Sequence, residues 1–168
     1  MKRSVPLALL LALIAAVPAS AGQAGPVTIA FQAASPSLSP TAGHVAGSFA
    51  MSGRFADAGT VTSSYHFAGS NVGGTATLTG TRGIFTIALT GRVGRVVDGR
   101  QTAGGRWRLC GGTGAYRHAA GSGLWEHVAD FGMAPHGMSP PAMHGAFYGL
   151  LARGAVRRPP GSLGVRCG

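Results

Sequence analysis

Apolar and polar residues alternate in short runs along most of the chain. In SFAMSGRF (residues 48–55), Phe49, Met51 and Phe55 fall on one face, and the two serines and Arg54 fall on the other. The same two-residue period recurs in the stretches VTSSYHF (61–67), TATLT (75–79), GIFTIALTGRV (83–93) and RWRL (106–109). This period is typical of antiparallel strands that bury one face. We therefore expect the apolar side chains of each run to point into a common core.

Two later runs extend the series. LWEHVADF (124–131) could form a short helix, but as a strand it places Trp125, His127 and Phe131 on one face; HGAFYGLLA (144–152) closes the series. Glycine and aspartate, which tight hairpins require, stand between the runs in NVGG (71–74), GTRG (80–83) and DGRQTAGG (98–105). The pattern predicts an all-β fold, a single antiparallel β-barrel of about eight strands over residues 45–152, because closure removes exposed edges.

Composition agrees with an all-β domain. The 29 glycines argue against helices, because a glycine inside a helix costs about 1 kcal/mol relative to alanine. Residues 22–44 are rich in Ala, Pro and Ser, and we predict a flexible leader there, with VTIAFQA (27–33) as a candidate first strand. Residues 153–168 are predicted to form a basic tail.

The first 21 residues have the features of a secretory signal peptide. Lys2 and Arg3 precede the apolar run Val5–Val17, which is shorter than the roughly 20 residues that span a bilayer. The small residues Ala-Ser-Ala then predict cleavage after Ala21. We expect an exported protein, secreted or periplasmic, with no membrane span.

The charge of the chain is strongly basic but scattered. The predicted signal peptide holds two of the 14 Lys and Arg, so 12 remain against 4 Asp and Glu, a formal charge of +8. A nucleic-acid interface would gather arginines beside aromatic residues on one face. Here they fall at strand ends and turns, and only the C-terminal tail holds several together. We interpret them as a solvated surface with weak attraction to acidic envelope polymers, and predict no specific nucleic-acid partner.

The two cysteines, Cys110 and Cys167, both lie in the predicted exported portion. An oxidising compartment and an even count favour one disulfide, which would tie the tail to the strand that carries Cys110. Closing a loop of this length stabilises a fold by roughly 4 kcal/mol in the chain-entropy model. Two free thiols, or an intermolecular bridge through Cys167, are the alternatives.

The glycine-rich stretch GGTGAYRHAAGSG (111–123) raises the question of a phosphate-binding loop. Such a loop needs a strand before it, a helix after it and usually a Lys followed by Ser or Thr. The predicted mature chain has no Lys, and an aromatic, strand-like run follows Gly123. We therefore interpret the stretch as a turn between strands, in which Gly112 and Gly114 permit a tight reversal and Thr113 bonds the local backbone.

This stretch, with Trp107 four residues ahead of it, resembles the signature of the dirigent and allene oxide cyclase barrel-like family, in the manner of its secreted bacterial members. Plant dirigents carry Gly-Gly-Thr-Gly-x-Phe-Arg-x-Ala-Arg-Gly at this point. Tyr116 stands at the Phe position and Ala120 stands where that pattern has Arg. The likeness extends loosely over residues 45–152. The matching positions are Gly111, Gly112, Thr113, Gly114, Arg117, Ala119 and Gly121.

The resemblance implies a cofactor-free barrel that holds a small hydrophobic or phenolic molecule in its interior. It also implies radical coupling or epoxide cyclisation, chemistries that rely on acidic, Tyr or other polar groups inside the cavity. The motif carries over Tyr116 and Arg117, for which stabilisation of the turn is the alternative role. With the two tryptophans, the candidate ligand-binding residues are Trp107, Tyr116, Arg117 and Trp125. An enzyme would need at least one acid pointing into the cavity; the candidates are Asp57, Asp98, Glu126 and Asp130.

The stretch FGMAPHGMSPPAMHG (131–145) offers a different chemistry. Thioether and imidazole groups suit copper, and soft methionine sulfur favours Cu(I). A hairpin loop whose methionines cover the barrel mouth is the alternative interpretation. The candidate metal ligands are Met133, His136, Met138, Met143 and His144.

The favoured hypothesis is an exported barrel that binds a small apolar or aromatic ligand and needs no cofactor. A cyclase or dirigent-type enzyme, a periplasmic copper-binding protein and a purely structural or adhesive barrel are the alternatives. The direction of the acidic side chains separates the first two hypotheses.

Overall fold

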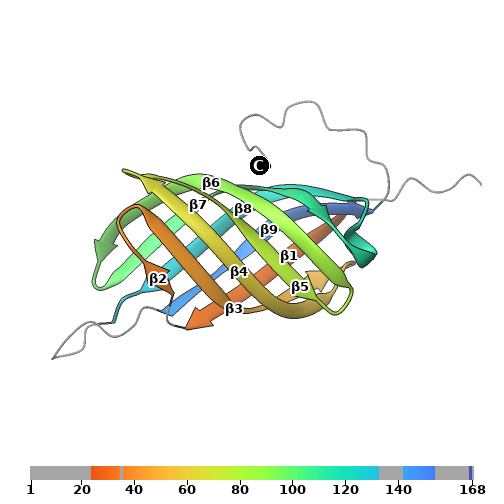
Figure 1. The fold of residues 1–168 in the computed structure, drawn as a ribbon, viewed down its shortest axis with the longest axis horizontal. Coiled ribbons are helices and arrows are strands. Elements are labelled where there is room, and N and C mark those ends of the chain that lie inside the picture. Colours follow the sequence, from red (N-terminus) through yellow and green to blue (C-terminus); the bar gives the residue numbers. More distant parts are fainter. Residues whose placement is uncertain (1–23, 35, 133–141, 154–166, 168) are drawn as a thin grey trace, which may run out of the picture.

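Strands make up almost all of the described chain. The structure, a computed structural model, describes residues 24–34, 36–132, 142–153 and 167. Within these residues, nine strands and one turn of 3₁₀ helix (η1) follow one another (Figure 1). Their bounds are β1 (Gly25–Ala34), β2 (Ser37–Leu38), β3 (Ala42–Gly53), β4 (Asp57–Ala68), β5 (Asn71–Gly80), β6 (Gly83–Val97), β7 (Arg100–Gly112), η1 (Gly114–Tyr116), β8 (Ala119–Asp130) and β9 (Ala142–Arg153).

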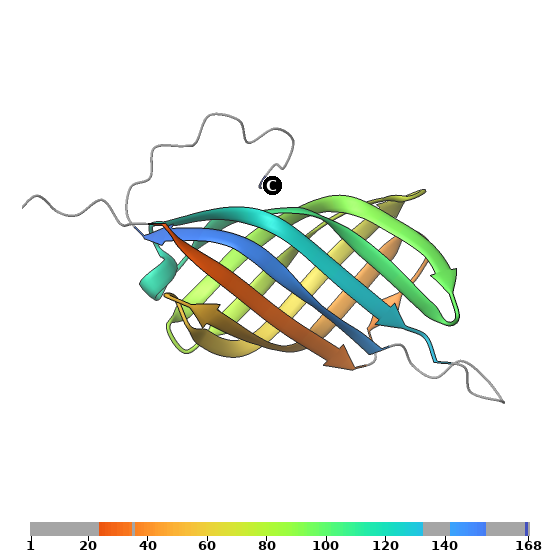
Figure 2. The same ribbon diagram turned by 180° about the vertical axis from the view of Figure 1, so that it is seen from behind.

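The sheet closes on itself. From β3 to β9 each strand pairs antiparallel with the next, and β1 pairs with β9 on one side and β3 on the other. Phe31 of β1, for example, faces Gly145 of β9 and Phe49 of β3 in the two ladders. Figure 2 shows β1, β9 and β8 side by side on the wall that closes the barrel. The predicted antiparallel barrel of about eight strands is therefore confirmed, with the two-residue β2 added beside the start of β3.

The predicted strand faces are those that the barrel buries. Phe49, Met51 and Phe55 are buried, whereas Ser52 and Arg54 are exposed. The run LWEHVADF belongs to strand β8 and not to a helix. Along most of the barrel every second side chain thus joins one interior core, whereas the end of β6 is exposed, with Val97 64% exposed.

The barrel begins earlier than the predicted boundary at residue 45. Strand β1 lies within the predicted leader, and it is the strand that joins the two ends of the sheet. Val27, Ile29 and Phe31 alternate with more exposed neighbours and are at most 5% exposed. The candidate strand at 27–33 is therefore a structural part of the barrel, although the Ala, Pro and Ser content of the region suggested flexibility.

The turns follow the glycine pattern in two of three places. Asp98 and Gly99 both have positive φ, 48° and 72°, as the turn of a two-residue hairpin with right-handed strand twist requires. GTRG contributes the turn between β5 and β6. NVGG instead lies inside β5, and the turn before it uses Gly69, whose φ is +60°.

Glycines in the barrel interior make room for the two tryptophans. A Cβ atom added at Gly149 would lie 2.8 Å from Cζ2 of Trp107 and would also meet the Ser122 carbonyl. A Cβ at Gly91 would similarly lie 2.8 Å from Cζ2 of Trp125. Interior glycines therefore compensate for the volume of the indoles, in the way that small residues facing large ones fill a narrow barrel.

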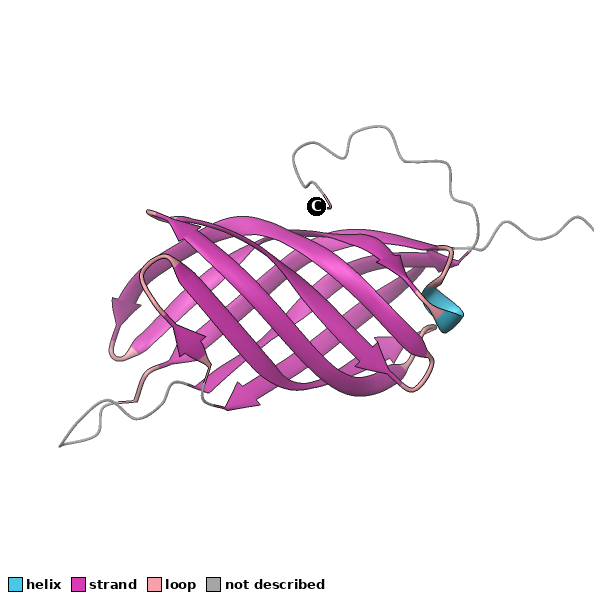
Figure 3. Ribbon diagram, in the orientation of Figure 1, coloured by secondary structure: helices cyan, strands magenta, loops and turns pink. Residues whose placement is uncertain are grey.

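The two ends of the barrel differ. At one end, η1 and the turn between β5 and β6 meet, and Cys110 near the end of β7 is bonded to Cys167, which confirms the predicted disulfide. At the other end lies β2, and Figure 3 shows η1 and β2 at opposite ends. Below, these are called the η1 end and the β2 end.

No helix among the described residues is long and apolar enough to cross a bilayer. The predicted signal peptide, residues 1–21, lies outside the described residues, as does most of the basic tail. Arginine side chains of the described part are exposed on the barrel at Arg54, Arg82, Arg92, Arg95, Arg100, Arg106 and Arg117. That placement fits a charged outer surface, and attraction to acidic polymers stays a prediction.

Candidate functional site

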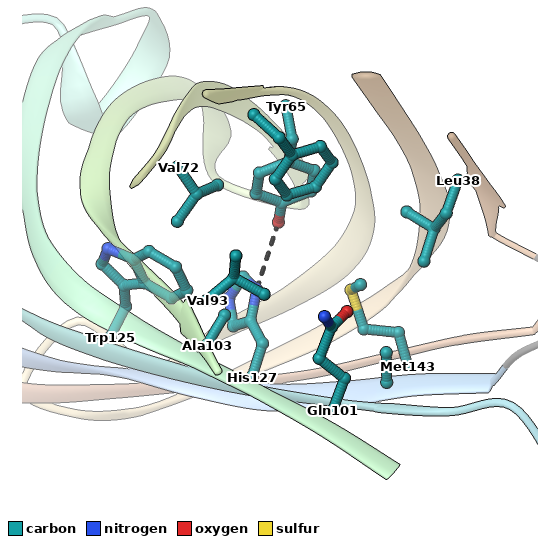
Figure 4. Close-up of a pocket in the computed structure, with 11 residues that line it drawn as sticks. Leu38, Tyr65, Val72, Val93, Gln101, Ala103, Trp125, His127 and Met143 are labelled. Carbon is teal, nitrogen blue, oxygen red and sulfur yellow. Dashed lines mark hydrogen bonds between the residues drawn. The ribbon is translucent and has the colours of Figure 1, made fainter. Parts of the chain in front are cut away.

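A cavity lies inside the barrel at the β2 end (Figure 4). The cavity has a volume of about 30 Å³. The cavity is therefore narrow, with room for roughly two waters before any side chain moves. Its lining residues are Leu38, Tyr65, Phe67, Val72, Val93, Gln101, Ala103, Trp125, His127, Ala129 and Met143.

Tyr65 and His127 form the polar centre of this cavity. The Tyr65 hydroxyl and His127 Nδ1 are 3.3 Å apart and share a hydrogen bond across the interior. The two side chains come from β4 and β8, which stand four places apart in the ring of eight strands. Figure 4 shows the imidazole beside the Trp125 indole and beneath the Tyr65 hydroxyl. A hydrogen-bonded pair thus joins opposite walls of an otherwise apolar barrel.

Aromatic rings enclose the imidazole. The ring centroids of Phe31 and Trp125 each lie 4.5 Å from that of His127, and the centroid of Phe147 lies at 5.4 Å. His127 is only 3% exposed. Its second ring nitrogen, Nε2, has no hydrogen-bond partner among the residues that the structure describes. A polar atom that water does not reach, on a side chain that lines the cavity, therefore has unused hydrogen-bonding capacity, and a ligand must displace a neighbouring side chain to reach it.

Burial sets the protonation of both groups. Desolvation lowers the pKa of His127 to about 3, because the apolar surroundings disfavour the imidazolium. Desolvation also raises the pKa of Tyr65 to about 12, although a hydrogen bond with Ser63 acts in the opposite direction. At neutral pH the pair is therefore uncharged, and either the hydroxyl or the imidazole N–H donates the hydrogen bond between them.

Trp125 forms one wall of the cavity and is held rigidly. Its indole N–H donates to the backbone carbonyls of Thr90 and Arg106, both at 3.1 Å. The side chain is 2% exposed. Because the N–H is already used, Trp125 offers only its aromatic face to a bound molecule.

The structure does not bring the four predicted ligand-binding residues together. Trp125 lines the cavity, whereas Trp107 is buried away from it and donates its N–H to the Tyr148 carbonyl at 3.1 Å. Tyr116 belongs to η1 at the opposite end of the barrel, and Arg117 is exposed beside it. A ligand in this cavity would meet Trp125 and none of the other three.

Tyr116 closes the η1 end. It is fully buried, its ring centroid lies 4.5 Å from that of Phe85, and its hydroxyl donates to Asp57 Oδ2 at 2.8 Å. Asp57 also accepts hydrogen bonds from Thr81 and from the backbone of Ala58. Burial raises the pKa of Asp57, but these hydrogen bonds outweigh it and hold the pKa below the usual 3.8. The arrangement stabilises the turn, which was the alternative interpretation of Tyr116.

The three other acids lie away from the cavity. Glu126 is exposed and accepts a hydrogen bond from the hydroxyl of Tyr148 at 2.8 Å. Asp130 Oδ2 lies 3.8 Å from Arg100 Nε at the edge of the barrel, and both side chains are about half exposed. Asp98 occupies a hairpin turn. None of the described acids lines the cavity.

The candidate metal ligands are only partly described. Met133, His136 and Met138 lie outside the described residues. Met143 is buried and lines the cavity, whereas its neighbour His144 is exposed on the outer face of β9. Adjacent residues of a strand point to opposite faces, so these two do not converge. Among the described residues, no three His, Cys, Asp or Glu side chains gather in a way that could hold a metal ion.

Sequence analysis alone did not select Tyr65, His127 or Gln101 as site residues. The alternation of VTSSYHF and LWEHVADF did place Tyr65 and His127 on inward faces. It could not show that they meet, because they are 62 residues apart and contact each other across the barrel. An inward-facing histidine on a predicted strand was the available indication, since buried histidines need a partner.

A small antiparallel barrel with an internal, partly polar cavity is thus the class of protein that fold and site define. Comparison with known proteins adds no relative: no family model, no curated protein and no solved structure matches the chain. The resemblance to the dirigent and allene oxide cyclase barrel-like family stays a prediction from residues 111–123.

Proposed function

We propose that this protein is exported and binds a small apolar or aromatic molecule in the cavity at the β2 end of the barrel. The observation that carries the proposal is the cavity itself, a largely apolar space lined by three polar side chains, Tyr65, His127 and Gln101. Ligand sites commonly combine apolar walls with a few placed polar groups. Trp125, Val72 and Phe67 supply the apolar walls, and Tyr65 and His127 supply polar groups.

The narrow cavity requires a small ligand or a movement at its mouth. Met143 and Leu38 both line the space, and methionine adapts easily because its side chain is unbranched and flexible. Leu38 belongs to β2, which pairs only with β3 in the sheet. Movement of these two side chains would widen the cavity without breaking the ring of eight strands.

Binding, and not catalysis, is the activity proposed. Cyclisation or radical coupling on the implied family pattern would use an acid in the interior, and the acids described lie on the surface or at the η1 end. Export is supported by the disulfide, which persists in oxidising compartments, together with the predicted signal peptide.

Native mass spectrometry of the protein purified from its own host tests the proposal. We expect a retained organic mass on the wild type and its loss from Ala103→Phe, in which a ring enters the cavity from β7. Ala50→Phe, which adds the same ring on the exposed face of β3, is the matched control and should keep the mass. A wild type that stays bare after incubation with mixtures of small aromatic compounds would overturn the proposal.

A further inference from the structure

The unpartnered Nε2 atom of His127 is the feature of the cavity that discriminates most between ligands. The aromatic rings around it cannot satisfy it, because Phe31 and Phe147 carry no polar side-chain atoms and the Trp125 indole N–H already bonds two backbone carbonyls. The other polar side chain of the cavity, Gln101, donates its amide N–H to the Gly94 carbonyl. A buried polar atom without a partner is less favourable than one in a hydrogen bond. A ligand that supplies the missing partner therefore gains affinity that a purely apolar ligand does not.

The bond to Tyr65 lets Nε2 act in either direction. If the Tyr65 hydroxyl donates to Nδ1, Nε2 carries the imidazole proton and donates it to a ligand. If Nδ1 carries the proton and donates to Tyr65, Nε2 presents a lone pair and accepts. A hydroxyl group is the ligand group that fits both tautomers, because it donates and accepts.

The surroundings of His127 disfavour a charged ligand. No Asp, Glu, Lys or Arg side chain lines the cavity within the described part of the chain. The lowered pKa of His127 keeps the imidazole neutral at pH 7, so it offers no counter-charge to a carboxylate. A carboxylate would lose its hydration on entry without gaining an ionic partner.

We propose that His127 determines the specificity of the barrel, selecting a small uncharged alcohol whose hydroxyl group bonds Nε2 while its apolar body packs against Trp125. This inference rests on the proposed ligand-binding function and names the ligand class of the same cavity. Tyr65 acts through His127 as a positioning residue. Its hydroxyl holds the imidazole in place, and the direction of their hydrogen bond determines which ring nitrogen carries the proton.

Three probes that share one benzene ring test the inference: benzyl alcohol, toluene and benzoate. Titrations are followed on the indole N–H resonances of Trp125, which lines the cavity, and of Trp107, which does not. Benzyl alcohol should shift the Trp125 resonance and bind roughly tenfold more tightly than toluene, which lacks the hydroxyl. Benzoate should bind at least about tenfold more weakly than benzyl alcohol.

His127→Phe keeps a planar ring in the aromatic enclosure and removes both nitrogens. In this variant the preference for benzyl alcohol over toluene should vanish while toluene still binds. His66→Phe, a change of the same kind on the exposed face of β4, should keep the preference. If His127→Phe does not fold, the wild type still decides: benzyl alcohol should shift the ¹⁵N resonance of His127 Nε2, and toluene should not.

The outcomes separate the two levels of the argument. If toluene binds the wild type as tightly as benzyl alcohol, or the preference survives in His127→Phe, the cavity binds ligands but the role of His127 is overturned. If neither compound binds the wild type, the proposed ligand-binding function fails and the inference fails with it.

Discussion

The imidazole of His127 is buried among aromatic rings, so its protonation is coupled to folding. Unfolded chains bind this proton below the usual pKa of 6.5, whereas the folded barrel resists it until about pH 3. Stability is therefore full above pH 6.5 and falls as the pH drops from there toward 3. The slope from one such group is about 1.4 kcal/mol per pH unit. Urea unfolding between about pH 7 and about pH 4.5 measures it.

The control for this prediction is His127→Phe, which has no proton to gain. Its free energy of unfolding should be nearly independent of pH over the same interval. Tyr65 does not complicate the measurement, because its raised pKa of about 12 keeps it protonated throughout. An unchanged slope in the variant would assign the pH dependence to other groups.

At the η1 end, the hydroxyl of Tyr116 has a structural task. Tyr116→Phe removes one donor from Asp57, and we expect a loss of about 1–2 kcal/mol in the free energy of unfolding. The pKa of Asp57 should then rise toward the usual 3.8, which an NMR titration of the carboxyl group measures. A carboxyl group whose pKa is lowered in the folded state stabilises the fold above pH 3.8, and this stabilisation is lost as the pH falls below that value. The free energy of unfolding of the variant should therefore fall less in acid than that of the wild type.

Tyr148→Phe is the matched control for that change. Its hydroxyl donates to Glu126 at the same distance, 2.8 Å, but on the exposed surface. Water replaces a lost surface hydrogen bond, so the variant should stay within about 0.5 kcal/mol of the wild type. Equal losses in the two variants would contradict the role given to Tyr116.

At the scale of the strands, interior glycines leave room for the tryptophans that stand two strands away in the sheet. Gly149→Ala should push strand β8 and Trp107 and cost about 1–3 kcal/mol, because the new Cβ would meet the Ser122 carbonyl oxygen and would lie 2.8 Å from the Trp107 indole. Gly25→Ala in β1 is the control, since its Cβ would meet Arg54 at an ordinary 3.4 Å. Thermal unfolding compares the two. Similar unfolding midpoints for both variants would show that the indole and strand β8 move aside without a loss of stability.

The faces of the strands could be predicted from the sequence, but their partners could not. Phe85, Ile87 and Leu89 are buried because a two-residue period fixes which way each side chain points. That period says nothing about which strands meet across the barrel, so the pair of Tyr65 and His127 needed the structure. The position of the cavity could not be predicted from the sequence either, because it depends on the summed volumes of side chains from seven strands.

The amino-acid composition of residues 22–44 suggested a flexible segment, but pairing with distant strands makes part of it a strand of the barrel. Residues 25–34 lie in a region whose Ala, Pro and Ser content suggested flexibility, yet they close the barrel as β1 between β3 and β9. The alternation of Val27, Ile29 and Phe31 was present in the sequence. Its role depends on pairing partners in distant segments of the chain, such as Phe49 of β3 and Gly145 of β9 for Phe31.

At the scale of the whole molecule, the disulfide links the η1 end of β7 to Cys167, so its covalent loop of 57 residues contains β8 and β9. The bond restricts the unfolded chain, and its reduction should lower the free energy of unfolding by about 4 kcal/mol in the chain-entropy model. Urea unfolding with and without reductant measures this loss. The double variant Cys110→Ala, Cys167→Ala should be as stable as the reduced wild type, and the reductant should not change its stability.

The cavity lies at the other end of β7, beside Gln101 and Ala103, so ligand affinity of the folded protein should not change on reduction. A loss of affinity that parallels the loss of stability would mean that the two ends of the barrel are coupled.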